Sequence, residues 1–167
     1  VDKMGQKLTQ AGKTMSMAFT APLAIIGGVA VANYDRQIKA ESRLASAITA
    51  TGGSAEEGLK DFQEYASALQ KVTNVGDEAT LEMLTLATQM GLNADQAKAA
   101  AQQALGMADA FGIGEQQTLR MAAALQDGDT QMLTRYIPAL KSVESETEKV
   151  RIATEFADNA FKTFADS

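Results

Sequence analysis

Breaks that contain glycine recur at short intervals from residue 52 onward, and the stretches between them have the apolar spacing of α-helices. Such breaks occur at Thr51–Gly53, Gly91, Gly112–Gly114 and Asp127–Asp129. No run alternates apolar and polar residues with enrichment in β-branched residues, which is the pattern of a strand. The sequence therefore predicts an all-α fold: a multi-helix array of about seven or eight helices without a sheet.

Several short motifs predict where these helices begin. Ser54 and Glu57 have the spacing of a capping box, as do Asn93 and Gln96, and Ser145 stands in the same relation to Glu148. Residues 74–77 form a predicted turn, in which we expect Asp77 to be an N-cap. A further helix is expected to run from Thr130 and to bend or end near Pro138.

Apolar residues three or four apart define the faces that we expect to be buried. In the helix after residue 54 this stripe consists of Leu59, Phe62, Ala66, Leu69 and Val72. In the helix after residue 93 it is a thin face of small side chains, Ala97, Ala101, Ala104 and Ala108, followed by Phe111. The last helix carries Val150, Ala153, Phe156, Ala157, Ala160, Phe161 and Phe164 on one face. The alanine-rich face predicts close approach of a neighbouring helix.

The longest uncharged stretch of the chain, Thr14–Tyr34, allows two interpretations. Its length suits a membrane span, since about 20 apolar residues cross a bilayer. Its proline, paired glycines and polar residues favour a buried helical hairpin, in which residues 4–19 fold back onto residues 22–48. The candidates for close packing or membrane activity are Pro22, Leu23, Ile25, Ile26, Gly27, Gly28, Val29 and Val31. We favour the hairpin, which divides the chain into an apolar N-terminal hairpin (1–50) and a helical module (51–167) within one continuous domain.

The chain begins with Val1, which fits a fragment or a processed segment of a longer protein.

Composition argues against several classes of function. The net charge of −6 argues against a nucleic-acid-binding surface, which needs clustered lysines and arginines. Without His or Cys, the chain lacks the commonest general base and the soft metal ligands. The carboxylate clusters at 56–57, 77–78 and 127–129 fall at predicted helix starts or turns, where carboxylates stabilise the free backbone N–H groups. We therefore expect no catalytic residue, no metal site and no cofactor.

Three stretches carry a family resemblance. The first is "KMGQKLTQAGKTMSMAFTAPLAIIGGVAVANYDRQIK" (3–39), and the second is "LQKVTNVGDEATLEMLTLATQMGLNADQAKAAAQQALGMADAFG" (69–112). The third is "MAAALQDGDTQMLTRYIPAL" (121–140). In this order they resemble the tape measure proteins of long-tailed bacteriophages and prophages, with the patterns L-Q-K-x-T-x-x-G-D-E, G-L-x-A-D-x-A, A-D-A-x-G and L-x-x-G-D followed by L-x-R.

The resemblance implies a structural virion protein rather than an enzyme. Tape measure proteins lie in the lumen of the tail, set its length during assembly, and leave through the tip when the genome is ejected. The implied partners are further copies of the chain in a small parallel oligomer, the tail tube and tail tip or baseplate proteins, and a tail assembly chaperone. The resemblance also implies contact with the host membrane, which fits a buried hairpin with latent membrane affinity.

Two other functions stay open beside the structural one. A membrane-inserting or pore-forming helical module at the host envelope is the alternative for which Thr14–Tyr34 is the discriminating feature. A wall-degrading enzyme is the other, because some tape measure proteins carry such domains elsewhere in their chains. Nothing in this sequence resembles one.

Overall fold

The computed structural model describes residues 29–167 of the chain. Within this range the protein consists of six α-helices and two short 3-10 helices, and this range contains no β-strand. The elements are α2 (Val29–Ala50), α3 (Ala55–Val72), α4 (Asp77–Gln89), α5 (Ala94–Phe111), α6 (Glu115–Gln126), η1 (Leu133–Arg135), η2 (Pro138–Ser142) and α7 (Glu146–Ala165). The prediction of an all-α fold is confirmed. The count of seven or eight helices and the N-terminal hairpin depend on residues 1–28, which lie outside the described residues.

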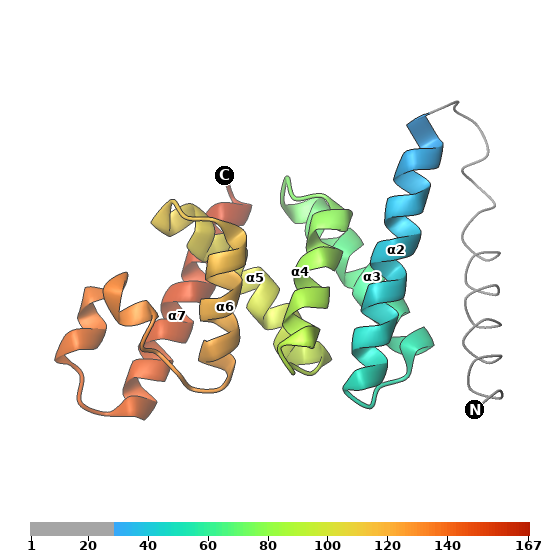
Figure 1. Cartoon of the computed structure of the whole chain (residues 1–167). Helices are drawn as coiled ribbons and strands as arrows, with labels where there is room; N and C mark the ends of the chain where they lie inside the picture. Colours follow the sequence, from blue (N-terminus) through green and yellow to red (C-terminus); the bar gives the residue numbers. More distant parts are fainter. Residues whose placement is uncertain (1–28) are drawn as a thin grey trace.

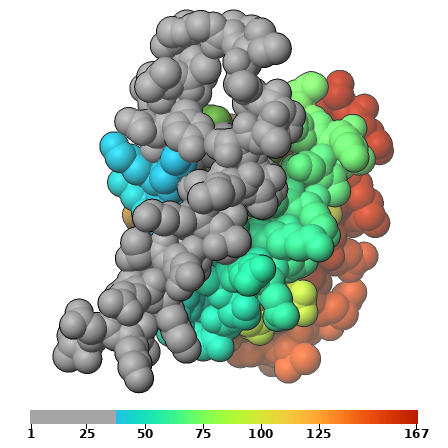
Figure 2. Space-filling model, turned by 90° about the vertical axis from the view of Figure 1, so that its right-hand side faces the viewer, coloured from blue at the N-terminus to red at the C-terminus, as the bar shows by residue number. Residues whose placement is uncertain are grey.

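The helices stand side by side in a row (Figure 1). Helices α2, α3 and α4 pack on one another and form the N-terminal group, while α5 packs on α6 and α7 to form the C-terminal group. Contacts of α4 with α5 are the main link between the two groups. Figure 2 views the row from the end occupied by α2 and α3, and the red residues of α7 lie at the far side. The array is thus built mainly from neighbours in sequence.

Glycine ends the helices of the array in the way that the sequence predicts. Gly91 and Gly112 have φ angles of 93° and 64°, a left-handed conformation that a residue without Cβ adopts at little cost. The next residue then bonds back into the helix: Leu92 N–H donates to the carbonyl of Ala87 at 3.3 Å. Leu92 is also buried, so the turn that ends α4 places an apolar side chain in the core.

The predicted helix starts are largely confirmed. Asn93 and Gln96 form a complete capping box at α5, with side chain to backbone distances of 2.9 and 3.1 Å. The hydroxyl of Ser145 accepts from the backbone N–H of Glu148 at 3.4 Å. The N-cap prediction for Asp77 is wrong, because Gly76 occupies that position and Asp77 is the first helical residue. There its Oδ1 accepts from the N–H of Glu78 at 2.9 Å, so the carboxylate still stabilises the helix start.

Large side chains fill the core of the N-terminal group. Leu44 on α2, Phe62 on α3 and Leu84 on α4 are fully buried. The predicted stripe of α3 is confirmed at Leu59, Phe62, Ala66 and Leu69. It fails at Val72, which is 56 % exposed because it is the last residue of α3 and the chain becomes extended at Thr73.

Small residues on α5 are buried, and one of them lies against α7. The predicted alanines Ala97, Ala101 and Ala104 are fully buried, together with Ala100. The tightest point is Gly106, at which an added Cβ would lie 2.6 Å from the carbonyl carbon of Ala160 on α7. On α7 the predicted face is buried at Ala153, Ala157 and Phe161. Helix α7 thus approaches α5 closely at Gly106, which lies on the opposite side of α5 from Ala97, so the close approach expected at the alanine face stays a prediction.

The helix predicted from Thr130 is replaced by the two 3-10 helices η1 and η2. Pro138 explains the difference, since it lacks an N–H and disfavours helical geometry at the residue before it. Ile137 accordingly has φ −116° and ψ 89°. Leu133, Ile137 and Leu140 are all buried, so this segment contributes to the core without being α-helical.

Candidate functional site

The residues predicted for close packing or membrane activity lie before α2 or in its first turn. Pro22, Leu23, Ile25, Ile26, Gly27 and Gly28 lie outside the described residues. Val29 and Val31 belong to α2, but their side chains are outside the description as well. Among the helices of residues 29–167, none is both long and apolar enough to cross a membrane. The interpretation of Thr14–Tyr34 therefore stays a prediction.

The carboxylate clusters lie where the sequence predicts, at helix starts and turns. Glu56 and Glu57 stand in the first turn of α3, as Asp77 and Glu78 do in α4. Asp129 follows α6, and its Oδ1 accepts from the backbone N–H of Gln131 at 2.8 Å. Within the described part of the chain, no group of three or more acidic side chains is arranged to hold a metal ion.

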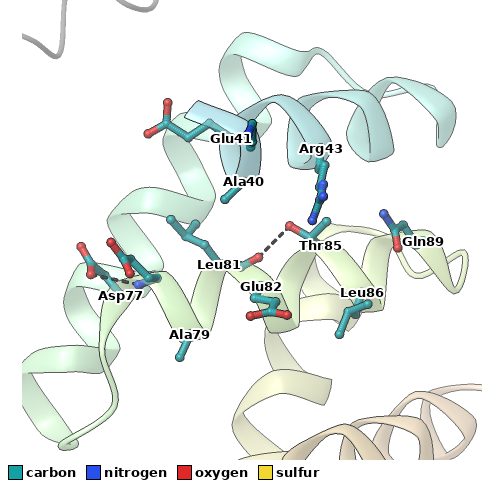
Figure 3. A pocket seen from close by; sticks show the side chains of 12 residues that line it. Ala40, Glu41, Arg43, Asp77, Ala79, Leu81, Glu82, Thr85, Leu86 and Gln89 are labelled. Carbon is teal, nitrogen blue, oxygen red and sulfur yellow. Dashed lines mark hydrogen bonds between the residues drawn. The ribbon is translucent and has the colours of Figure 1, made fainter. Parts of the chain in front are cut away.

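A groove between α2 and α4 has a volume of about 590 Å³ (Figure 3). Leu81 of α4 and Ala40 of α2 point toward one another across it, and Arg43 extends from α2 toward Thr85. Thr85 is buried, and its hydroxyl donates to the carbonyl of Leu81 at 2.7 Å. Apolar and satisfied polar groups thus form the interior of the groove.

The two walls of the groove carry different charges. Lys39 and Arg43 stand on α2, while Asp77, Glu78 and Glu82 stand on α4. Glu41 also lines the groove, and its Oε1 accepts from the side chain of Gln63 on α3 at 3.3 Å. Among the side chains that the structure describes, those of residues 38–167, no ion pair joins the basic wall to the acidic wall. Such a groove suits an amphipathic segment that carries charge beside an apolar stripe.

A buried polar junction ties the three helices of the C-terminal group together. Gln103 on α5 is 4 % exposed. Its Nε2 donates to Asp158 Oδ1 on α7 at 2.9 Å, and its Oε1 accepts from Gln126 Nε2 on α6 at 3.0 Å. Both polar ends of the amide are therefore satisfied, so its burial is compensated. This arrangement fixes how the helices meet and offers no reactive group.

A second polar contact joins α3 to α5. The hydroxyl of Tyr65 donates to the carbonyl of Lys98 at 3.0 Å, and burial raises the pKa of Tyr65 to about 12. The ammonium of Lys98 pairs with Asp61 and lies 6.0 Å from the ring centroid of Phe62. Tyr65 therefore stays protonated across the physiological range, which gives this cluster a structural role in joining the two helix groups.

Comparison with protein-family models, with curated proteins and with solved structures gives no match for this chain. The functional argument therefore rests on the residues and their geometry.

Sequence reasoning did not identify the groove. Each of its charged residues has the spacing of an ordinary solvent-exposed helix position. The available signal was weak: Lys39 and Arg43 are four residues apart, as are Glu78 and Glu82, so each pair shares one helix face. That the two faces lie beside one another depends on the packing of α2 against α4, which local spacing does not reveal.

Proposed function

We propose that this chain is a folded structural segment of a phage tail tape measure protein. In this proposal it helps to set tail length during assembly and leaves the tail during genome ejection. The ordered set of three stretches that resemble the family carries the proposal. Their distinctive patterns fall at the ends of α3, α4, α5 and α6, where one helix passes into the next element.

The residues that carry the resemblance have definite local roles at these junctions. In L-Q-K-x-T-x-x-G-D-E, the Thr73 hydroxyl donates to the carbonyl of Leu69 at 2.8 Å and accepts from the N–H of Val75 at 3.3 Å. Gly76 then provides the N-cap of α4. A shared pattern of this kind supports a shared helix–turn–helix geometry, because Thr73 and Gly76 both take part in the turn.

The glycine junctions argue that the ruler itself lies elsewhere in a longer chain. A continuous α-helix advances about 1.5 Å per residue, so the length of a rod-like chain maps directly onto the length of a tube. Residues 29–167 instead fold back at each junction. We therefore propose a folded module beside rod-like segments, packed less compactly in the tube than in the free protein. Equal hydrogen-exchange protection of α2–α7 in free protein and in intact particles would contradict the looser packing.

The deciding experiment measures tail length by electron microscopy after an in-frame deletion in the parent gene, outside this module. Removal of a stretch of 100 residues is expected to shorten the tail by about 150 Å. Duplication of the same stretch is the matched control and is expected to lengthen the tail by the same amount. Unchanged tail length in both variants would overturn the proposal.

The proposal includes a set of partners and a location. The chain would lie in the lumen of the tail as a small parallel oligomer, in contact with tail tube, tip or baseplate proteins and with an assembly chaperone. The net charge of −6 fits partners other than nucleic acid. We propose no catalytic role, and clearing of cell-wall material by this chain in a zymogram would contradict that.

The alternative proposal is a membrane-inserting or pore-forming module at the host envelope. The uncharged stretch Thr14–Tyr34 favours it, because its length matches the hydrocarbon core of a bilayer. Release of dye from liposomes by the full chain, abolished in the Ile26→Asp variant, would support this function. Asp is costly inside a bilayer, whereas the matched Thr147→Asp variant changes an exposed residue of α7 and keeps the stretch intact.

A further inference from the structure

We propose that the N-terminal segment of this chain, residues 3–19, docks as a helix in the groove between α2 and α4. The inference concerns contacts within one chain and does not rest on the proposed function. It starts from the charges of the groove, which four carboxylates and two basic side chains line. Among residues 38–167, whose side chains the structure describes, Glu78 and Glu82 on the α4 wall have no ion-pair partner.

The N-terminal segment has the complementary charge. Residues 1–28 contain three lysines, Lys3, Lys7 and Lys13, and a single acidic residue, Asp2. Lysine beside the carboxylates of α4 would complete charge pairs at the rim of the groove. Charge complementarity therefore selects this segment over an acidic one.

The same segment carries an apolar stripe for the interior of the groove. Met4, Leu8, Ala11 and Met15 are four, three and four residues apart, which places them on one face of a helix. Lys3 and Lys7 each precede a stripe residue by one position, so they would flank the stripe. A helix of this kind can cover Ala40 and Leu81 with its apolar face while its lysines face Glu78 and Glu82.

The segment is also long enough to reach the groove. From Val29 at the start of α2, the groove residue Lys39 lies about 15 Å along the helix axis and Arg43 about 21 Å. A helix from Met4 to Phe19 would be about 24 Å long. A chain that reverses between residue 19 and residue 29 would therefore bring residues 3–8 alongside the groove.

Connection within one chain favours this occupant over a second molecule. The segment is joined to α2, so a short linker keeps it near the groove at high effective concentration. A segment from another copy would lose translational and rotational entropy on binding. We therefore assign the groove to the N-terminus of the same chain.

Crosslinking of the full chain tests the assignment directly, because the sequence has no cysteine and introduced cysteines are unique. We expect the pair Gln6→Cys and Gln89→Cys to form a crosslinked monomer with a short bismaleimide. The matched control pair, Gln6→Cys and Gln131→Cys, is expected to stay uncrosslinked, because Gln131 is exposed beside η1 in the C-terminal part of the array. A crosslinked dimer would show that a second copy fills the groove, and equal yields for both pairs would overturn the proposal.

A charge exchange tests the role of the lysines with the same readout. Lys7→Glu is expected to lower the crosslinking yield of the Gln6 and Gln89 pair, and adding Glu82→Lys is expected to restore it. Glu64→Lys on the exposed surface of α3 is the matched control and should not restore it. High salt should lower the yield in the unaltered background, because exposed charges are screened. A crosslinking yield that changes neither with salt nor with Lys7→Glu would contradict the charge complementarity.

Discussion

The two helix groups both bury large side chains, but they differ in how closely the backbones of their helices approach. In the N-terminal group, large side chains such as Phe62 and Leu84 fill the space between α2, α3 and α4. The C-terminal group also buries large side chains such as Leu105 and Leu119, but at Gly106 the backbones of α5 and α7 approach so closely that an added Cβ would clash. A large buried side chain is sensitive to truncation, whereas a close contact between backbones is sensitive to any added atom. Truncation should therefore be most costly at sites such as Phe62, and enlargement at Gly106.

The largest expected effect is a truncation in the N-terminal group. Phe62→Ala should lower the free energy of unfolding by roughly 4 kcal/mol, because it removes a fully buried ring and leaves a cavity. Urea denaturation followed by circular dichroism measures the change. Val72→Ala on the same helix is the control, since Val72 is exposed and its truncation should change the value by at most about 0.5 kcal/mol. A loss of less than about 1 kcal/mol for Phe62→Ala would contradict the view that this large side chain stabilises the N-terminal group.

The next effect is an enlargement in the C-terminal group. Gly106→Ala should lower the free energy of unfolding by about 3 kcal/mol, since the new methyl group would overlap the backbone of α7 and backbone atoms move less readily than side chains. Gly76→Ala is the matched control, because an added Cβ there meets no atom within 4 Å. Gly76→Ala should lower the free energy of unfolding by at most about 1 kcal/mol, the loss expected from a weaker N-cap. Equal melting temperatures for the two variants would contradict the close approach of α5 and α7.

The smallest effect concerns the polar junction, which has no counterpart among the large side chains of the N-terminal group. Gln103→Leu should lower the free energy of unfolding by about 1 kcal/mol, because the partners on α6 and α7 lose a hydrogen bond each but stay partly exposed to water. Gln102→Leu, at the neighbouring position of α5, is the control. A double-mutant cycle of Gln103→Leu with Gln126→Leu should show coupling, and strict additivity would mean that the bond contributes nothing.

Local chemistry made much of the fold predictable. The Asn93–Gln96 box, the stop at Gly91 and the stripe from Leu59 to Leu69 depend on residues close in sequence, and all are confirmed. The errors have local causes as well: Gly76 takes the N-cap position expected for Asp77, and Pro138 converts an expected α-helix into 3-10 turns.

The features that sequence could not reveal are non-local. Periodicity identified the alanine face of α5 but gave no sign that Gly106 would meet the backbone at Phe161. Nothing near Gln103 in the sequence identifies Asp158 as its partner. The groove depends in the same way on how α2 and α4 pack, so its two charged faces could be predicted separately but not together.

The contacts between helices have a consequence for the order in which the chain folds. The main contacts of the described helices join elements one or two steps apart: α2 meets α3 and α4, and α5 meets α6 and α7. Chains rich in such local contacts fold fast, because few distant segments have to find one another first. A chain that emerges end first from a ribosome can therefore complete the N-terminal group while α6 and α7 are still being synthesised, and each later helix finds its partner already in place.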